Sequence, residues 1–379
     1  MRRVIPYGRQ TIDEDDIKSV VEVLKSDWLT TGPKIEEFER AICSFTSAKR
    51  GVAVSNGTAA LHTAIAATGI GPGDEVLVPP MTFAASANCV VYQGGKPVFV
   101  DVDPETLLID PDQVRSRITK ATKAIVSVDY AGNPCPYDEL NEIAQEHDLV
   151  FISDACHALG AEYQGRKVGA LADLTALSFH PVKHITTGEG GMVLTQNDEL
   201  ETKMRRFRNH GIDRTASQRE AEQTWFYEMI ELGYNYRLTD IQCALGISQL
   251  RKLPSWLKRR REIARMYHEA LRDIDSIRTM KETPGGKHAY HLFVIEIDGG
   301  LGNRNRVFTE LRKRGISANV HYIPVHLHPY YIKKFGTGPG LCPIAEAAYQ
   351  RILSLPMFGT MVDEEVHEVI DSVRESVAQ

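Results

Sequence analysis

The stretch Ser178–Gly191 reads SFHPVKHITTGEGG and follows a short apolar run at 174–179, which has the length and composition of a buried strand. Its lysine, Lys183, therefore lies on a loop just past a strand. An earlier run, LVFISD at 149–154, ends in Asp154 and predicts a second strand. Because the carboxyl ends of parallel strands meet at one edge of an open α/β sheet, where such sheets bind ligands, the two side chains are expected to converge there.

A lysine and a carboxylate at such an edge suit one cofactor. A lysine amine forms Schiff bases with carbonyl compounds, and pyridoxal 5′-phosphate also needs a carboxylate that holds its ring nitrogen protonated. A surface lysine and an aspartate that caps a turn would give the same pattern. The interpretation therefore requires further parts of a cofactor site.

A phosphate cradle is predicted at SNGTAAL, residues 55–61, which follows a strand at 51–54 and opens an alanine-rich helix. Gly57 lets the backbone approach an anion, and the first amides of the helix point at that anion unpaired. Thr58 and Ser178 each add a hydroxyl. An ordinary helix N-cap is the alternative interpretation. Phe83, at a predicted strand-to-helix junction, either stacks on a flat heteroaromatic ring or belongs to the core.

In chain order, the phosphate turn, the aromatic residue, Asp-x-x-His and the lysine motif resemble the sugar aminotransferases of the DegT/DnrJ group. These are fold-type I pyridoxal-phosphate enzymes that act on nucleotide-linked keto sugars. The resemblance spans nearly the whole chain and is greatest to the PseC-type UDP-4-amino-4,6-dideoxy-N-acetyl-beta-L-altrosamine transaminases of pseudaminic acid synthesis. It rests on AIVSVDYAG at 124–132, SDACHALGAEY at 153–163 and VHYIPVH at 320–326. Many relatives carry glutamine where this chain has His157, so that position alone does not decide the substrate.

The resemblance implies a ping-pong transamination. Lys183 would hold pyridoxal phosphate as an internal aldimine, and L-glutamate, the implied amino donor, would displace it and leave pyridoxamine phosphate as the intermediate. Freed Lys183 would then act as general base and acid. Asp154 would keep the ring nitrogen protonated, and His157 would hydrogen-bond Asp154 or the ring hydroxyl. The implied acceptor is the C4 ketone of a UDP-linked 4-keto-6-deoxy-N-acetyl amino sugar.

Further residues receive roles through the same resemblance. Asn235 would reach the cofactor phosphate of the neighbouring subunit, in a homodimer with shared active sites. For Asn235 and for each of the residues named next, a role in packing or in a turn is the alternative. The residues that would contact the nucleotide sugar are Tyr7, Asp27, Trp28, Leu29, Thr30, His321, Tyr322, Ile323 and Pro324.

Three rival functions stay open. A dehydratase on the same scaffold replaces the catalytic lysine by histidine, whereas here Lys183 is present and His184 merely follows it. A transaminase for another nucleotide-linked ketone, such as a dTDP-sugar or a C3 ketone, fits the same motifs. A non-catalytic regulator that has kept the fold would need a defective site, and all the expected parts are present.

Composition argues against several other classes. The chain has 379 residues, 42% hydrophobic and 25% charged, with a net charge of −6 and no basic stripe, so no nucleic-acid partner is expected. No run of about eighteen apolar residues predicts a membrane span, and the N-terminus lacks an apolar signal region. Six scattered cysteines suit a reducing cytosol, so a cytoplasmic location is expected. The histidines at 321–328 lack companion ligands, so no metal is expected.

Alternating helix and strand signals in the first half predict a mainly parallel mixed sheet flanked by helices. In the helix at 13–26, Ile17, Val20, Val21 and Leu24 form one apolar stripe. Residues 212–233 break the rhythm and predict a flap or hairpin that reaches over a site or a partner, with a disordered loop as the alternative. Strands are expected near 52–55, 75–78, 98–102, 124–128, 149–153, 175–179 and 191–195.

A long helix at 238–271, kinked near Pro254, leads into the second part of the chain. The predicted division is a large PLP-binding domain at 1–250 and a smaller C-terminal α/β domain at 251–379, which is the fold-type I arrangement. The small domain is expected to hold strands at 290–297 and 316–322, a helix at 304–314 and a final helix from Asp363.

Overall fold

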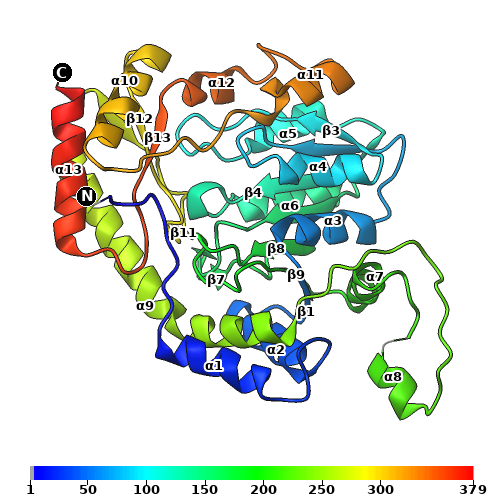
Figure 1. Cartoon of the computed structure of the whole chain (residues 1–379). Coiled ribbons are helices and arrows are strands. Elements are labelled where there is room, and N and C mark those ends of the chain that lie inside the picture. Colours follow the sequence, from blue (N-terminus) through cyan, green and yellow to red (C-terminus); the bar gives the residue numbers. More distant parts are fainter. Residues whose placement is uncertain (1–3, 215, 379) are drawn as a thin grey trace.

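The computed structural model describes residues 4–214 and 216–378 and is built around a seven-stranded sheet (Figure 1). The strand order is β1-β9-β8-β5-β4-β2-β3. β9 runs antiparallel to both of its neighbours, and the remaining pairs are parallel. The predicted mainly parallel mixed sheet is confirmed. The strands are β1 (Arg50–Val54), β2 (Glu75–Val78), β3 (Lys96–Phe99), β4 (Thr122–Val128), β5 (Val150–Asp154), β8 (Leu174–Ser178) and β9 (Gly191–Thr195).

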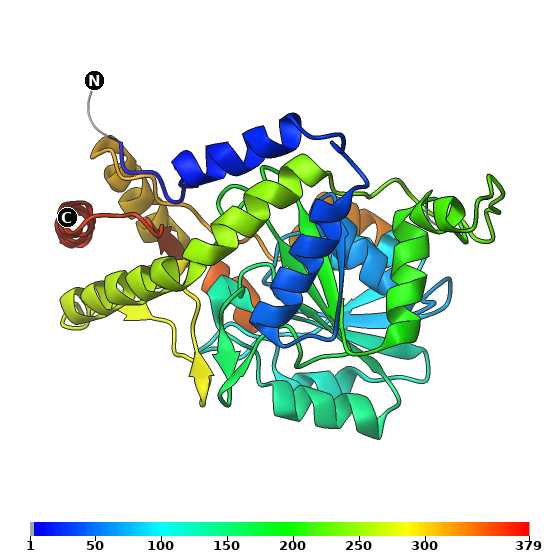
Figure 2. The ribbon, with the colours of Figure 1, turned by 90° about the horizontal axis from the view of Figure 1, so that it is seen from below.

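Helices flank this sheet, and its inner strands are therefore buried at nearly every position. Figure 2 shows α9 (Asp240–Leu271) beside α1 (Glu14–Leu24) and α2 (Pro33–Thr46), running from the large sheet to the C-terminal part. The other helices around the sheet are α3 (Gly57–Ala67), α4 (Ala85–Tyr92), α5 (Pro111–Arg117), the 3₁₀ turn η1 (Tyr130–Gly132), α6 (Tyr137–Glu146) and α7 (Asp198–Arg208).

The C-terminal part has its own core, which also takes in Ile5 from the N-terminal segment. The amide of Ile5 donates to the carbonyl of Gly315 at 2.9 Å, so the chain start is tied to this part. α9 continues through Pro254 and past residue 250 as one helix, and the division at 250 stays a prediction. The elements here are β10 (Ile277–Thr279), β12 (Phe293–Ile297), α10 (Gly300–Lys313), η2 (Val325–Leu327), α11 (Pro329–Phe335), α12 (Pro343–Tyr349), β13 (Ile352–Leu355) and α13 (Asp363–Val377).

A small third sheet and an arm complete the fold. The sheet joins β6 (Glu162–Tyr163), β7 (Arg166–Lys167) and β11 (Gly286–Lys287). The arm at 212–233 carries α8 (Ala216–Ala221) and extends away from the body on the right of Figure 1. Its two limbs meet at an isolated antiparallel bridge between Ile212 and Met229, as a hairpin would. Trp225 on this arm is 84% exposed.

Two strand predictions are wrong. β3 lies at 96–99 rather than 98–102, and Val102 makes only an isolated bridge with Ile109. No strand forms at 316–322, because side chains occupy backbone groups that a ladder would pair. The side chain of Asn319 accepts from the amide of Val320 at 2.9 Å, and the Tyr130 hydroxyl donates to the carbonyl of His321.

The apolar stripe of α1 does not face the core. Ile17 and Leu24 are 48% and 55% exposed, whereas Asp16 and Val23 are buried. Asp16 is directed inward by polar partners on α9, because Lys252 lies 2.9 Å and the side-chain amide of Gln249 2.7 Å from its carboxylate. α1 therefore packs on α9 through polar contacts and leaves most of its apolar stripe outside.

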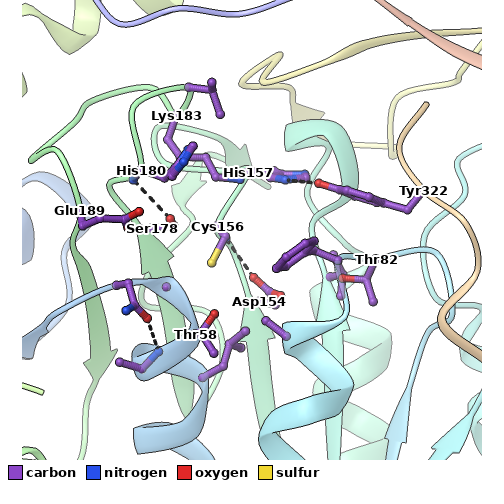
Figure 3. A pocket seen from close by; sticks show the side chains of 18 of the residues that line it. Thr58, Thr82, Asp154, Cys156, His157, Ser178, His180, Lys183, Glu189 and Tyr322 are labelled. Atoms are coloured by element: carbon purple, nitrogen blue, oxygen red, sulfur yellow. Dashed lines mark hydrogen bonds between the residues drawn. The ribbon is translucent and has the colours of Figure 1, made fainter. Parts of the chain in front are cut away.

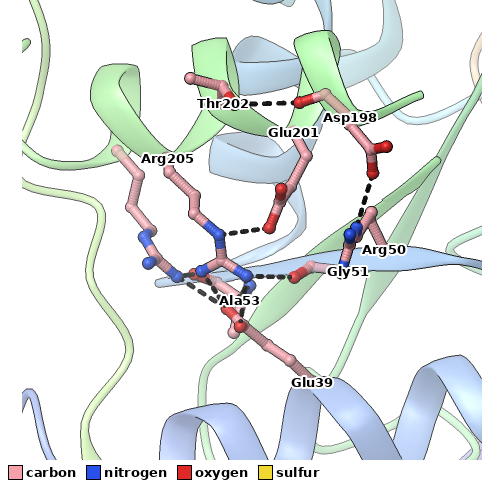
Figure 4. Close-up of polar contacts among 9 residues, drawn as sticks. Glu39, Arg50, Gly51, Ala53, Asp198, Glu201, Thr202 and Arg205 are labelled. Atoms are coloured by element: carbon pink, nitrogen blue, oxygen red, sulfur yellow. Dashed lines mark hydrogen bonds and ion pairs between the residues drawn. The ribbon is translucent and has the colours of Figure 1, made fainter. Parts of the chain in front are cut away.

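Side chains satisfy the open side of the edge strand β1 (Figure 4). Glu39, buried on α2, accepts from the amide of Ala53 at 2.9 Å. Arg208 donates to the carbonyl of Ala53 at 2.8 Å, and Arg205 donates to that of Gly51 at 3.2 Å. Both arginines also pair with the Glu39 carboxylate, at 2.9 and 2.8 Å. The edge strand is thus closed to pairing with another chain.

Glu39→Gln should destabilise the fold markedly. The amide keeps an oxygen for Ala53 but removes the buried charge that pairs with two partly buried guanidinium groups. Breaking a buried ion pair in this way typically costs about 3–5 kcal/mol of unfolding free energy. Denaturant unfolding at fixed protein concentration measures the change. Asp198→Asn is the control, because Asp198 pairs with exposed Lys49 and Arg50; equal losses in the two variants would contradict the special role of Glu39.

Candidate active site

A cavity of about 1070 Å³ lies where β5 and β8 end, between the large sheet and residues 319–322 (Figure 3). The structure brings together many of the residues predicted from the sequence. Those that line the cavity are Tyr7, Gly57, Thr58, Phe83, Asp154, His157, Ser178, Lys183, His321 and Tyr322.

Asp154 is the last residue of β5 and is buried at the cavity floor. The Ser86 hydroxyl donates to its Oδ2 at 2.6 Å, and the amide of Cys156 donates to its Oδ1 at 3.2 Å. The oxygen of Ser86 in turn lies 2.7 Å from the Thr82 hydroxyl. These donors hold the carboxylate in one orientation. Ser86 and Thr82 were not predicted as site residues, and their only signal in the sequence is their place beside Phe83.

Lys183 is half-buried on the turn after β8, where its amide donates to the carbonyl of His180 at 2.9 Å. Burial lowers the pKa of the Lys183 amine, and Cys156 and Asp154 partly oppose that shift. Within residues 4–214 and 216–378, the side chain has no hydrogen bond or ion pair. A lowered pKa increases the fraction of neutral amine, which is the nucleophilic form.

The N-terminus of α3 abuts the end of β8. Asn56 is its N-cap and accepts from the amide of Ala59 at 2.8 Å, while the first amides of the helix have no intrahelical partner. A Cβ at Gly57 would lie 2.9 Å from the Cβ of Ser178, too close without a shift. A Cβ at Gly191 would collide with the carbonyl of Asn56. The segment is therefore both an N-cap and an open cradle for an anion.

His157 is buried on the other side of the cavity, with Nε2 3.2 Å from the Tyr322 hydroxyl. Burial lowers the pKa of His157 well below its usual value, and the charge of Lys183 lowers it further, so the imidazole is neutral at physiological pH. His157 was expected to hydrogen-bond Asp154 or the ring hydroxyl of the cofactor. In the structure, the Asp154 carboxylate accepts hydrogen bonds from Ser86 and Cys156. His157 also packs on His291, with ring centroids 4.3 Å apart.

Aromatic side chains form the walls. Phe83 is 61% exposed, its ring centroid 6.2 Å from that of Tyr322. Tyr7 lies 5.5 Å from His321 between ring centroids, and its carbonyl accepts from the amide of Met357 at 2.9 Å. That contact holds the N-terminal segment against the C-terminal part. Tyr7 therefore lines the cavity together with residues that are far from it in the sequence.

Both ring nitrogens of His321 lie within hydrogen-bond distance of other side chains of the protein. Its Nδ1 lies 2.9 Å from the Ser354 hydroxyl and its Nε2 lies 3.3 Å from the side-chain amide of Asn319. Tyr130, Asn319 and Ser354, which anchor this segment, were not predicted. Nothing in the local sequence connects them, because their contacts join parts of the chain that are remote from one another.

Several predicted residues lie outside the cavity of this chain. Asn235 is exposed on an extended segment between Tyr234 and Tyr236, which do line the cavity. Because side chains alternate along an extended chain, Asn235 points away from its own cavity. The other residues outside the lining are Asp27, Trp28, Leu29, Thr30, Ile323 and Pro324.

The residues present fit pyridoxal phosphate. An open helix end with Thr58 and Ser178 suits a phosphate, a fixed carboxylate suits a ring nitrogen, and a lysine amine whose pKa is lowered by burial suits an aldehyde. Within the described ranges, no group of three or more His, Cys, Asp or Glu residues is arranged to hold a metal ion. None of the helices in those ranges is long and apolar enough to cross a membrane.

Comparison with known proteins identifies the family. The model described as the DegT/DnrJ/EryC1/StrS aminotransferase family matches residues 10–374, so the chain belongs to that family. The spore coat polysaccharide biosynthesis protein SpsC of Bacillus subtilis is 41% identical over 377 residues, which are 98% of this chain and 97% of SpsC.

Two solved structures are similar over the whole chain. The putative sugar aminotransferase Spr1654 of Streptococcus pneumoniae, in its PMP form, has a TM-score of 0.94 and 34% identity, with 99% of each chain covered, and its PLP form is also similar. Helicobacter pylori PseC, an aminotransferase involved in the biosynthesis of pseudoaminic acid, has a TM-score of 0.92 and 34% identity, covering 99% of this chain and 100% of PseC. The chain is a pyridoxal-phosphate-dependent sugar aminotransferase, with pyridoxamine phosphate as its intermediate form.

Lys183→Ala should abolish covalent capture of the cofactor. Borohydride reduction of the wild-type holoenzyme should attach the cofactor to the peptide that contains Lys183, and the variant should give no such peptide. Turnover should fall at least the roughly 10²–10⁴-fold typical of general acid–base catalysis. In the apoprotein, the rate of capture should rise with pH around a midpoint below 10.5, because burial lowers the pKa of the amine. Labelling of another lysine would contradict the assignment.

Proposed function

We propose that this enzyme transfers an amino group from L-glutamate to the C4 ketone of a UDP-linked 4-keto-6-deoxy-N-acetyl amino sugar, in a pseudaminic acid-type pathway. The observation that carries the proposal is one cavity that joins Lys183, Asp154 and the open end of α3. Its volume of about 1070 Å³ is at the upper end for pockets that take one drug-sized ligand, so it has room for a sugar beside a cofactor. The similarity to PseC supports the sugar class.

The residues divide into groups with different tasks. When bound, pyridoxal phosphate supplies an electron sink for the bonding electrons of a neighbouring carbon. Lys183 would hold the cofactor and then move the proton between the two reacting carbons, a role that the lowered pKa of its amine favours. Asp154, oriented by Ser86, would keep the proton on the ring nitrogen. Gly57, Thr58 and Ser178 would bind the phosphate, with Phe83 against the ring and His157 near the ring hydroxyl.

The sugar would lie against the wall made by Tyr7, His321 and Tyr322. The charge-neutral rings of this wall suit a sugar ring, which offers both C–H faces and hydroxyl groups. Ile323 and Pro324, just beyond the wall, would contact the nucleotide. A transaminase for a dTDP-linked sugar or a C3 ketone would use the same cofactor site. It would therefore differ from the proposed enzyme in the residues of this wall.

A homodimer with shared active sites would explain the exposed apolar groups. In one chain, exposed apolar side chains lie on the α1 stripe, at Trp28 and Leu29 after α1, and at residues 225–232 of the arm. Apolar surface of this extent commonly marks a protein interface. Asn235, turned away from its own cavity beside that arm, would donate its amide to the cofactor phosphate in the partner subunit. The segment from Asp27 to Thr30 would contact the nucleotide sugar across the same two-fold interface.

A substrate panel tests the sugar assignment. Purified enzyme with L-glutamate should aminate the UDP-linked 4-keto sugar faster than its dTDP-linked counterpart and faster than a 3-keto isomer. NMR of the product should place the new amine at C4. Faster amination of the dTDP-linked ketone, or an amine at C3, would contradict the proposal while leaving the aminotransferase family intact.

Mixed dimers test the shared site. In a dimer of one Asn235→Ala chain and one Lys183→Ala chain, one site would inherit both changes and the other neither. Recovery of about half the wild-type activity per dimer is therefore expected, because a two-fold dimer carries two equal sites. Each variant paired with itself is the control. No activity in the mixed dimer would show that Asn235 serves its own chain.

A further inference from the structure

A hydrogen bond between two cavity-lining side chains joins the C-terminal part to the segment after β5. The hydroxyl of Tyr322 lies 3.2 Å from Nε2 of His157, and the two rings are nearly parallel, at 24° (Figure 3). His157 follows β5, whereas Tyr322 follows the segment that Tyr130 and Ser354 anchor. Figure 3 shows the two side chains pointing toward one another above Asp154. Neither residue was expected to bind the other.

The surroundings of His157 decide where its proton lies. Nδ1 of His157 is buried and has no hydrogen-bond partner in the described part of the chain. A proton on Nδ1 would therefore be an unpaired buried donor, which proteins rarely tolerate. With the proton on Nε2, only a lone pair stays unpaired, and the Nε2–H group donates to the Tyr322 oxygen.

The state of Tyr322 follows from the same contact. Burial raises the pKa of the Tyr322 phenol well above its usual value, so the phenol keeps its proton. If its oxygen accepts from His157, its own proton is free to be donated elsewhere. Tyr322 lines the cavity, so that proton is available to a bound molecule.

We propose that His157 and Tyr322 act as one unit, in which His157 donates to the Tyr322 oxygen and thereby directs the phenolic proton to an oxygen atom of the bound ligand. In this unit His157 positions Tyr322, and Tyr322 is the group that donates to the ligand oxygen. The inference rests on the proposed function, because the ligand oxygen belongs either to the cofactor ring or to the sugar. In both cases the shared chemistry is an oxygen that accepts a hydrogen bond from a neutral phenol.

Three variants test the unit: Tyr322→Phe, His157→Asn and the double variant. Phenylalanine removes the donor, and asparagine keeps a polar group near Nδ1 but is too short to reach Tyr322. Each single variant should weaken ligand binding about fivefold, the usual effect of one hydrogen bond. The double variant should show no further loss, because the two residues act through one donor. Additive losses, or an unchanged Tyr322→Phe enzyme, would overturn the inference.

Two measurements show whether the accepting oxygen belongs to the cofactor or to the sugar. If the cofactor supplies it, the pH midpoint of the visible absorption band of the holoenzyme should shift by roughly half to one unit without any sugar present. If the sugar supplies it, the band should not move and KM for the keto sugar should rise while KM for L-glutamate does not. Tyr330→Phe, at an exposed tyrosine outside the cavity, is the control. The ionisable groups that act electrostatically on this pair or lie beside it are Lys183, His184, His291, His321, Asp154, Cys156, Tyr7 and Tyr130.

The tautomer can be measured without cofactor or turnover. Nitrogen-15 NMR of histidine-labelled apoprotein, assigned by comparison with His157→Asn, should show the proton of His157 on Nε2. A proton on Nδ1 would overturn the inference even if the variants lose activity. Failure of Lys183 to capture the cofactor would instead contradict the proposed function, so the two failures are distinguishable.

Discussion

The approach of helix α3 to the ends of β8 and β9 is the constraint on which the site depends. It requires the absence of a Cβ at Gly57, beside Ser178, and at Gly191, beside the carbonyl of Asn56. With those atoms absent, the positive end of the helix, a strand-end hydroxyl and the turn that carries Lys183 converge at one edge. Asp154 reaches the same edge on β5, which pairs directly with β8. The parallel part of the sheet thus gathers groups that are far apart in the sequence.

Electrostatics at this edge follow from burial. Removal from water lowers the pKa values of Lys183, His157, His184 and His291, which reduces the positive charge around the cavity. The attraction for an anion then comes mainly from the helix end, which carries no titratable proton. An arrangement of this kind favours the neutral, nucleophilic form of the lysine amine, because the helix end can attract an anion without a nearby cluster of cations.

The sequence predicted several residues that line the cavity floor, but it did not predict the residues that support them. Lys183, Asp154 and Gly57 belong to local motifs, in which a strand end or a helix start determines where the side chain lies. Ser86, Tyr130 and Ser354 act through contacts between distant parts of the chain, and a single sequence contains no signal for such contacts. The missing strand at 316–322 has the same origin, since a hydroxyl from Tyr130 occupies a carbonyl that a ladder would use. The α1 stripe shows a different limit, because apolar periodicity identifies one face of a helix without saying what packs against it.

The two sides of the cavity have different origins, and this division bears on substrate choice. The floor comes from the first half of the chain, whereas Tyr7 and Tyr322 are held against it by the C-terminal part, through the amide of Met357 and the hydroxyl of Ser354. Both ring nitrogens of His321 lie within hydrogen-bond distance of Ser354 and Asn319. Its imidazole therefore supports the wall and has no free polar atom for a ligand. In the proposed function, hydrogen bonding to the sugar would therefore fall to the phenols beside it. A change in sugar specificity would then need new residues on this wall, while the proposed cofactor floor could stay the same.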